Sequence, residues 1–402
     1  MLVGERIMKE YEEQKRIRAI LMRGGTSRAL FVMRNELPAD PEVRDRVILR
    51  MYGSPDVRQV DGLGGADPLT SKLAIIGPPT RPDADVDYTF GQVSITAPFV
   101  DYAGNCGNIS AAVGPYAIDE GLVDAVEPIT TVCIHQTNTR CLLVAHVPVR
   151  NGRAAVEGEY AIDGVPGTGA RIMLDFSDTA GAVTGKLLPT GRPSDLLDVP
   201  GVGPVEASIV DAGTPCVFVR AKDMGLSGTE TPAEIDADRA LNERIERVRG
   251  TAAAHIGIVD HWQEAARKSP YLPFLAMVSP PADYLAFTTG QTVQADRVDL
   301  VSRLLFMLRM HKAYPVTGTV CTGAAAKIPG TIVSEVVRPE SRDRSVIHIG
   351  HPAGVIEIEA AVELQAEGPK LVRASLGRTA RRLMEGYVFV PWSTYADAQN
   401  SL

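Results

Sequence analysis

Short apolar runs separated by Gly, Pro, Asp and Asn dominate the chain from Ile17 onward. These runs are rich in Val, Ile, Phe and Tyr, and the turn residues between them make the pattern typical of β-strands. The clearest are IRAILM, ALFVM, LAIIG, VDYTFGQVSI, TTVCIHQ, CLLVAHVPV, RIMLDF, VEASIVDAG and CVFVRA. The sequence therefore predicts many strands and few helices.

Three segments carry apolar residues at helical spacing: Pro41–Tyr52, Glu234–Gly250 and Asp296–His311. Pro41 suits a first helical turn. The third segment contains VDLVSRLLFMLRMHK, in which the apolar period is close to 3.6 residues. His311 would end this helix, where a cationic side chain suits the helix dipole, so we assign it a structural role.

Two other predicted helices, Gly107–Ile118 and Gly318–Ile328, consist of small residues and are almost uncharged all round. A helix without a polar face must be enclosed, so each is expected to run through a wrapped sheet. This predicts an α+β chain with an N-terminal arm (1–16, polar or a short helix), an N-terminal lobe (17–190) and a C-terminal lobe (191–402). The last strand of the C-terminal lobe can cross back to the N-terminal lobe.

Composition narrows the functional class. The 402 residues are 45% hydrophobic and 22% charged, as in ordinary globular proteins, and the length allows two or three domains. The net charge of -8 argues against a nucleic-acid partner. No run reaches the roughly 18 apolar residues of a membrane helix, and the charged N-terminus does not resemble a signal peptide. We therefore expect a cytoplasmic protein without a membrane partner.

Five cysteines are widely spaced, odd in number and without a CxxC pair. This disfavours a disulfide framework or a structural zinc site. No HExxH or similar close set of ligands is present, so we predict no metal. The open question is whether one cysteine is reactive.

Met22–Ser27 (MRGGTS) follows a predicted strand. Gly24 and Gly25 would let backbone N–H groups approach a ligand, and Thr26 and Ser27 add hydroxyl donors, so an anion could bind there beside Arg23. On this hexapeptide alone, a plain Gly-Gly turn with an exposed arginine is slightly favoured.

The segment Asp61–Lys72 (DGLGGADPLTSK) lacks the Gly-Lys-Ser/Thr order of a nucleotide-binding loop. Most lysines are solvated. Lys72, however, lies between a glycine loop and an apolar strand, where desolvation would lower its pKa into the range useful for proton transfer.

Cys106, in AGNCGNISAA, lies at the mouth of the first enclosed helix. The unpaired N–H groups there, including those of Gly107 and Asn108, can cradle an anion and favour a thiolate. The alternative is a buried structural cysteine in a tight turn. Because Gly-Asn-Cys-Gly-Asn is unusual for a turn, we favour the functional interpretation.

The second enclosed helix begins in PVTGTVCTGAAA, where Thr317, Gly318 and Thr319 take the corresponding places, and Cys321 is expected in the core. Two helix N-termini that face one cleft could hold two or three carboxylates without a metal. His351, on a turn before a strand, can reach such a site. His135 fits either a polar cleft or a hydrogen-bonded strand.

Together, Met22–Ser27, Asp61–Lys72, Phe90–Ile118 and Pro315–Gly330 resemble the PrpF family of 2-methylaconitate cis-trans isomerases, 4-oxalomesaconate tautomerases and methylitaconate isomerases. The resemblance extends from Ile17 to about Val390. It implies the diaminopimelate epimerase-like fold, with two lobes that each wrap a sheet around a central helix and an active site in the cleft between them.

The resemblance also implies cofactor-independent allylic proton transfer on a small unsaturated di- or tricarboxylate such as 2-methylaconitate, aconitate or 4-oxalomesaconate. Lys72 and Cys106 would be the acid/base pair. The substrate would lie on residues Arg23, Gly24, Gly25, Thr26, Ser27, Ser71, Gly107, Asn108, Thr317, Gly318, Thr319 and His351.

Epimerases of this fold use a cysteine at each helix entrance, and Thr317 stands at the second entrance here. An amino-acid epimerase or racemase is therefore a weaker alternative, as is a non-catalytic accessory protein to a dehydratase. The familiar MRGGTSKG string reads MRGGTSRA, so Arg28 is either a further carboxylate partner or a surface residue. A homodimer is compatible with these expectations.

Overall fold

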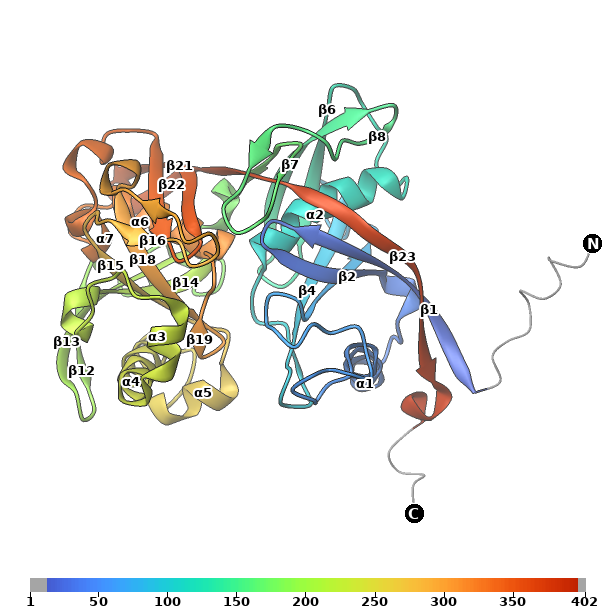
Figure 1. Ribbon diagram of the computed structural model, residues 1–402, viewed down its shortest axis with the longest axis horizontal. Helices are drawn as coiled ribbons and strands as arrows, with labels where there is room; N and C mark the ends of the chain where they lie inside the picture. The colour runs from blue at the N-terminus through green and yellow to red at the C-terminus, as the bar shows by residue number, and fades with distance from the viewer. Residues whose placement is uncertain (1–12, 397–402) are drawn as a thin grey trace, which may run out of the picture.

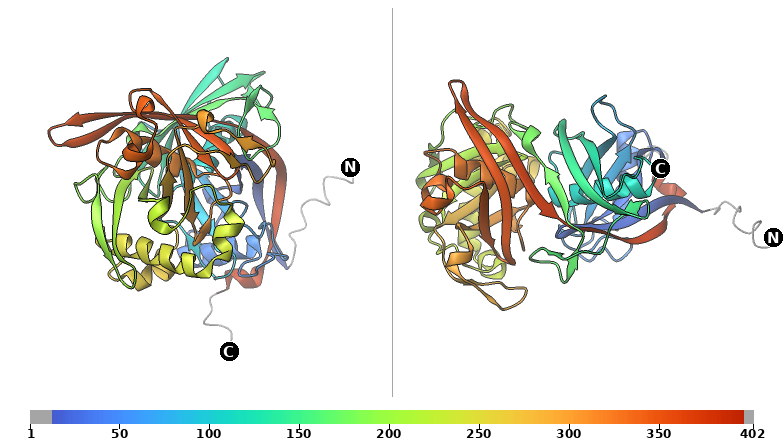
Figure 2. Two further views of the ribbon diagram at one scale, coloured as in Figure 1. Left: turned by 60° about the vertical axis from the view of Figure 1, so that its left-hand side comes forward. Right: turned by 90° about the horizontal axis from the view of Figure 1, so that it is seen from above.

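The computed structural model describes residues 13–396, and most of the expected arm (1–16) lies outside them. Two lobes stand side by side (Figures 1 and 2). The N-terminal lobe surrounds helix α2 (Gly107–Asp119), and the C-terminal lobe surrounds helix α6 (Val316–Lys327). Only the last residue of each helix is not fully buried. The two enclosed helices predicted from small, uncharged residues are confirmed.

A single 19-stranded sheet runs through both lobes. Its strands in the N-terminal lobe are β1 (Gln14–Gly24), β2 (Ser27–Met33), β3 (Lys72–Gly77), β4 (Val86–Val93), β5 (Val100–Asp101), β6 (Ile129–Gln136), β7 (Cys141–Arg150), β8 (Arg153–Ala154) and β11 (Ile172–Asp175). Those in the C-terminal lobe are β12 (Asp195–Val199), β13 (Gly203–Ala212), β14 (Thr214–Arg220), β15 (Phe274–Ser279), β18 (Leu300–Phe306), β19 (Arg309–Met310), β20 (Val346–His351), β21 (Gly354–Gln365) and β22 (Gly368–Arg378). All nine predicted strand runs lie on these strands.

The lobes are joined by β22 and by β23 (Ala380–Pro391). β22 pairs with β11, whereas β23 pairs with β1 over almost its whole length. Figure 1 shows β23 (red) passing from the C-terminal lobe to lie beside β1 (blue). The C-terminal end of the described chain therefore completes the sheet of the N-terminal lobe. The exact boundary between the lobes stays a prediction.

The remaining elements cover the outer faces. Helix α1 (Pro41–Tyr52) matches its predicted bounds; Asp40 caps its N-terminus, accepting from Val43 N at 2.9 Å, and Gly53 ends it in the left-handed region. The others are α3 (Pro232–Ala237), α4 (Arg239–His255), α5 (Ala265–Lys268), α7 (Ile332–Val336) and the hairpins β9 (Tyr160–Ala161) with β10 (Thr168–Gly169) and β16 (Tyr284–Leu285) with β17 (Thr292–Val293).

Two helix predictions need correction. Glu234–Gly250 is not one helix, because Asp238 interrupts it and caps α4 through a hydrogen bond from Leu241 N. The predicted helix Asp296–His311 is wrong: this segment forms strands β18 and β19. Every residue of β18 is buried, since α6 lies on one side of its sheet and α4 on the other. A strand covered on both faces loses the polar alternation that separates it from a helix.

The two enclosed helices meet at their N-termini. A Cβ atom built on Gly107 would lie 2.5 Å from Val316 Cγ1 and 2.7 Å from Val316 Cβ. Glycine at this position is therefore required for the close approach of α2 to α6. The two helix dipoles present their positive ends to the same junction between the lobes.

We predict that Gly107→Ala will push the helix ends apart and lower the free energy of unfolding by about 1–3 kcal/mol, the usual cost of overpacking a core. Gly386→Ala is the matched control, because a Cβ at Gly386 meets nothing within 4 Å. Urea unfolding measures both variants, and equal stability of the two would contradict the close contact.

Candidate active site

Lys72 begins strand β3 and lies almost completely buried at the junction of the lobes, 2% exposed. Its Nζ donates a hydrogen bond to Gln92 Oε1 at 2.6 Å. Two aromatic rings enclose the ammonium group, with centroids 5.3 Å (Phe90) and 4.7 Å (Phe306) from Nζ. Phe90 comes from the N-terminal lobe and Phe306 from the C-terminal lobe, so both lobes exclude water from this lysine.

Burial lowers the pKa of Lys72, and Cys106 and Asp67 only partly oppose the shift. The Cys106 thiol lies close enough to Lys72 to act on its pKa. Cys106 precedes the first residue of α2, it is only partly buried, and its side chain makes no capping hydrogen bond. The structure thus brings together a desolvated lysine and a thiol at a helix N-terminus, as the sequence predicted for these two residues.

The turn between β1 and β2 packs directly against the start of α2. A Cβ on Gly24 would lie 2.3 Å from the Asn108 carbonyl oxygen, and one on Gly25 would lie 1.9 Å from Asn108 Oδ1. Thr26 N donates to the same Oδ1 at 3.3 Å. The hydroxyl oxygens of Thr26 and Ser27 are buried and have no hydrogen-bond partner among residues 13–396. Because an unsatisfied buried hydroxyl is costly, these two groups are suited to a ligand.

Two predicted binding residues are occupied elsewhere. Arg23 donates to the carbonyl oxygens of Gly25 and Thr379, each at 3.0 Å, and so braces the turn. Ser71 donates to Gln59 Oε1 at 2.7 Å. Among residues 13–396 these bonds use Nη1 of Arg23 and the hydroxyl hydrogen of Ser71, so the binding roles of both residues stay predictions.

Arg28 lies on the α1 side of the sheet, the opposite face from Lys72. Its neighbour Ala29 pairs with Lys72 and packs in the core around α2, whereas Leu30 packs with α1. The guanidinium reaches the loop at Gly65, where a Cβ would lie 2.8 Å from Arg28 Nη2. Arg28 therefore supports this loop rather than the lysine side of the sheet.

On the C-terminal side, the predicted residues lie in the first turn of α6. Thr319 Oγ1 donates to the Pro315 carbonyl at 2.9 Å, so its hydroxyl hydrogen is used within the first turn of α6. Thr317 is 1% exposed, and a Cβ on Gly318 would lie 2.8 Å from Leu304 Cδ1. Cys321 is buried one turn further on and donates to the Val210 carbonyl at 3.0 Å, as expected for a core residue. No second thiol lies at this helix entrance.

Two histidines near the junction are buried and neutral. Burial lowers the pKa of His311 to about 3, and nearby Lys72 adds to the shift. Burial also lowers the pKa of His351 well below its ordinary value. His351 Nδ1 accepts from Ala353 N at 3.2 Å, and its ring stacks on Tyr314. His351 is thus tied into the β20–β21 turn.

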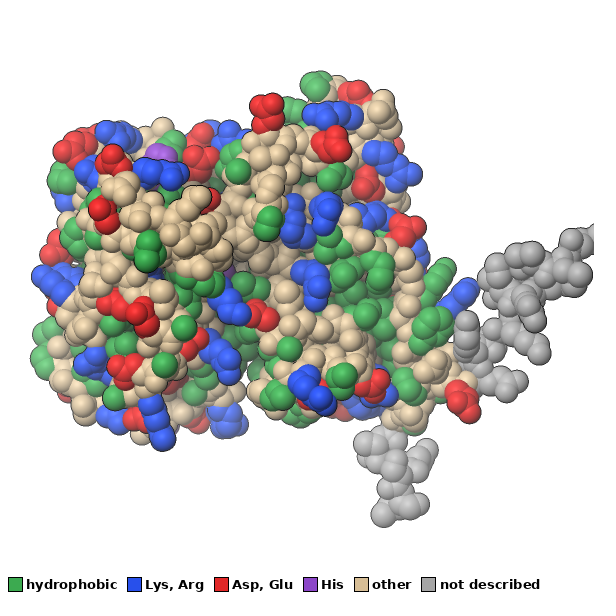
Figure 3. Space-filling view, in the orientation of Figure 1, with side chains coloured by type: hydrophobic (Ala, Val, Ile, Leu, Met, Phe, Trp, Pro, Cys, Tyr) green, Lys and Arg blue, Asp and Glu red, His purple; other side chains and the backbone are tan. Residues whose placement is uncertain are grey.

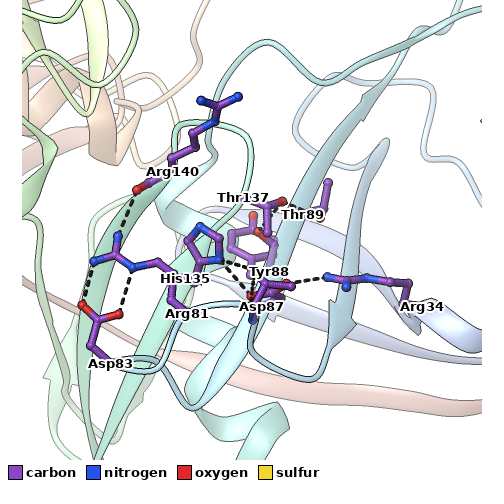
Figure 4. Close-up of polar contacts among 10 residues, drawn as sticks. Arg34, Arg81, Asp83, Asp87, Tyr88, Thr89, His135, Thr137 and Arg140 are labelled. Atoms are coloured by element: carbon purple, nitrogen blue, oxygen red, sulfur yellow. Dashed lines mark hydrogen bonds and ion pairs between the residues drawn. The ribbon is translucent and has the colours of Figure 1, made fainter.

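His135 lies on strand β6, and Figure 4 shows its ring directed toward Asp87. Its Nδ1 is 2.9 Å from Asp87 Oδ1, and Arg34 pairs with Asp87 Oδ2 at 2.8 Å. Burial would raise the pKa of Asp87, but hydrogen bonds from Arg34, Thr80 and His135 hold it below its ordinary value. Both alternatives for His135 apply: it is a hydrogen-bonded strand residue, and it lines a polar cleft with Thr80 and Arg140.

Sequence reasoning missed three residues around Lys72: Gln92, Phe306 and His311. Gln92 lies directly opposite Lys72 in the β3–β4 pair, so the hairpin register would have revealed it. Phe306 and His311 were lost because their segment was predicted as a helix. His311 does not end a helix; it follows β19 in the loop before α6.

A cavity of about 360 Å³ opens beside this cluster between the lobes. One side is formed by Val57 and residues 66–69 and 92–96, and the other by Asp236 and residues 306–307 and 309–312. Lys312 Nζ and Asp67 Oδ2 lie 2.5 Å apart across it. Figure 3 shows the surface hollowed between the lobes at the lower edge. The Lys72 cluster is thus next to an interlobe opening.

Comparison with known proteins agrees with this geometry. The family model described as PrpF protein matches residues 14–391. The 3-methylitaconate isomerase of Eubacterium barkeri is 57% identical, over 94% of this chain and 98% of that protein. The 2-methyl-aconitate isomerase of Shewanella oneidensis is 39% identical, over 95% and 99%.

Solved structures give the fold. A methylitaconate-delta-isomerase crystal structure has 55% identity and a TM-score of 0.80, over 97% of this chain and 100% of that one. A hydroxyproline epimerase from Agrobacterium vitis has 11% identity and a TM-score of 0.58, over 94% and 93%. The diaminopimelate epimerase-like α+β fold is therefore confirmed. Within residues 13–396, no helix has both the length and the hydropathy needed to cross a membrane.

The buried histidines make stability depend on pH. Each has a folded-state pKa below the unfolded value of about 6.5, so unfolding takes up protons below that pH. The free energy of unfolding is therefore highest above pH 6.5 and decreases as the pH is lowered through this value. We predict that the free energy of unfolding decreases less for His311→Gln than for the native protein when the pH is lowered from 7.5 to 5.5. The difference should approach about 1.4 kcal/mol per pH unit below 6.5. Urea titrations measure it, with exposed His146→Gln as control; identical pH dependence in all three proteins would refute the assignment.

The chain belongs to the PrpF family, and its curated relatives compared above are isomerases.

Proposed function

We propose that the protein is an isomerase that moves a carbon–carbon double bond in a small unsaturated di- or tricarboxylate by allylic proton transfer, without a cofactor. The observation that carries the proposal is the pairing of buried Lys72 with the Cys106 thiol at the N-terminus of α2. The 57% identity to a 3-methylitaconate isomerase favours a branched itaconate-type substrate over the tricarboxylates. We further expect it to act in the cytoplasm.

The proposed reaction starts with removal of a proton from the carbon next to a carboxylate. The electron pair spreads over the allylic system and the carboxylate oxygens, and a proton returns to the far allylic carbon, which shifts the double bond. One group must accept a proton and then release one. Cys106 and Lys72 are suited to this exchange because each can hold the proton and they lie close enough for Cys106 to act on the pKa of Lys72.

The substrate carboxylates would be bound by neutral donors. The unpartnered hydroxyls of Thr26 and Ser27 and the N-terminal turns of α2 and α6 surround the junction. Such donors stabilise developing negative charge, with each contributing a few kcal/mol to the transition state. Gly107, Asn108, Thr317 and Gly318 belong to these turns and keep their proposed binding roles. His351 keeps its role as a neighbour of the site.

The absence of a thiol at Thr317 weakens the epimerase alternative. A two-base racemisation needs an acid/base on each face of the substrate. A threonine hydroxyl is too weak an acid to replace a thiol in that role at neutral pH.

We predict that Lys72→Met will abolish isomerisation of 3-methylitaconate while leaving the fold intact, because methionine fills the same apolar space without a proton-carrying group. Proton NMR in deuterated buffer follows both double-bond shift and deuterium uptake. Lys186→Met, which removes an exposed lysine, should keep full activity. Turnover by Lys72→Met at the native rate would overturn the assignment.

Cys106→Ser should retain substrate affinity and lose about 10²–10⁴-fold in kcat, since a serine hydroxyl is a much poorer proton carrier than a thiol. The matched control is Cys133→Ser, which changes a partly buried cysteine on β6. Steady-state kinetics separates kcat from KM. An unchanged kcat in Cys106→Ser would leave Cys106 with a binding role only.

A further inference from the structure

A second cavity, of about 720 Å³, lies between the segment Tyr160–Asp163 of the N-terminal lobe and the C-terminal lobe. It is bounded by the segment Tyr160–Asp163, by residues 296–299 and by strands β20 and β21. None of Lys72, Cys106, Thr26 and Ser27 lines it. Charged and histidine side chains are intermixed over the upper part of this lobe in Figure 3.

Four arginines line this cavity: Arg297, Arg338, Arg344 and Arg378. None of them forms an ion pair with a carboxylate within the described part of the chain. Arg338 donates only to backbone carbonyls, at Ala295 and Val298. Such a concentration of unpaired guanidinium groups is unusual on a protein with a net charge of -8.

Arg378 is the most informative of the four. It is 4% exposed, and its Nε is buried with no hydrogen-bond partner among the described residues. Within residues 13–396 its side chain donates one hydrogen bond, from Nη1 to the neighbouring Gly377 carbonyl, at 2.8 Å. Burial lowers the pKa of Arg378 to about 10, which leaves it protonated at neutral pH. A buried, charged group with an unused hydrogen-bond donor is costly unless a ligand supplies the missing acceptor.

The acidic residues of the cavity are largely occupied already. Asp299 accepts from Ser341 Oγ and from both the backbone and the ring of His348. Glu357 accepts from Tyr160 and Arg171, and Asp163 accepts from the Val355 N–H. Asp296 is exposed. Asp296 and the second oxygens of Glu357 and Asp163 keep free lone pairs, but within residues 13–396 none of them accepts a hydrogen bond from Arg297, Arg344 or Arg378.

We propose that this cavity is a second binding site, which does not include Lys72 and Cys106, for a small anion whose carboxylate or phosphate groups are held by the guanidinium groups of Arg297, Arg344 and Arg378. Guanidinium forks match the planar oxygens of a carboxylate and the oxygens of a phosphate equally well. The proposal does not rest on the isomerase function.

Isothermal titration of the full chain tests the site with two probes: tricarballylate, a saturated tricarboxylate that has no double bond to move, and inorganic phosphate. We expect the chain to bind one equivalent of at least one probe, with an affinity that falls tenfold or more in the double variant Arg297→Gln/Arg344→Gln. Both arginines are exposed, so this variant should fold. The probe that binds identifies the anionic group.

The matched control is Arg150→Gln/Arg239→Gln, which removes two exposed arginines elsewhere and changes the net charge equally. It should bind as the native protein does. The proposal is overturned if neither probe binds in a way that depends on Arg297 and Arg344. It is also overturned if both double variants lower the affinity of the bound probe to the same extent. Failure of the isomerase proposal would appear instead as missing turnover and would leave this equivalent unchanged.

Discussion

The desolvation of Lys72 is the constraint on which the arrangement of the two lobes depends. A lysine on an open strand would stay charged and solvated, and it would exchange no proton near neutral pH. Here Phe90 from one lobe and Phe306 from the other enclose it, so neither lobe alone could exclude the water. The candidate active site therefore exists only where the two lobes meet.

The two enclosed helices follow from the same requirement. Each must place its N-terminus at the junction, and Gly107 against Val316 shows how closely they approach. Small residues let a sheet close around each helix at short distance, so almost every residue of α2 and α6 is buried. The positive ends of the two dipoles then supply a field for anions that needs no additional charged side chain.

The sequence predicted most of this because the decisive signals were local. Uncharged small residues indicated enclosed helices, and Lys72 and Cys106 stood at the start of a strand and of a helix. What failed depended on tertiary contacts. The local sequence of strand β18 does not indicate that both faces of the strand are covered. Local sequence likewise does not indicate that Arg23 and Ser71 form hydrogen bonds with Thr379 and Gln59, which only the fold brings near. Pairing across 356 residues cannot be inferred from one segment.

The positions of Arg23 and Arg28 bear on the charge that surrounds Lys72. A substrate carboxylate beside Lys72 would favour its charged form and so oppose the effect of burial on its pKa. In the proposed reaction we therefore expect the carboxylates to lie at a distance from Nζ, on neutral donors such as the hydroxyls of Thr26 and Ser27 and on the helix ends. Arg23 braces a turn, and Arg28 lies on the other face of the sheet. Neutral donors bind an anion without drawing it into an ion pair, which leaves the negative charge free to move along the allylic system during the reaction.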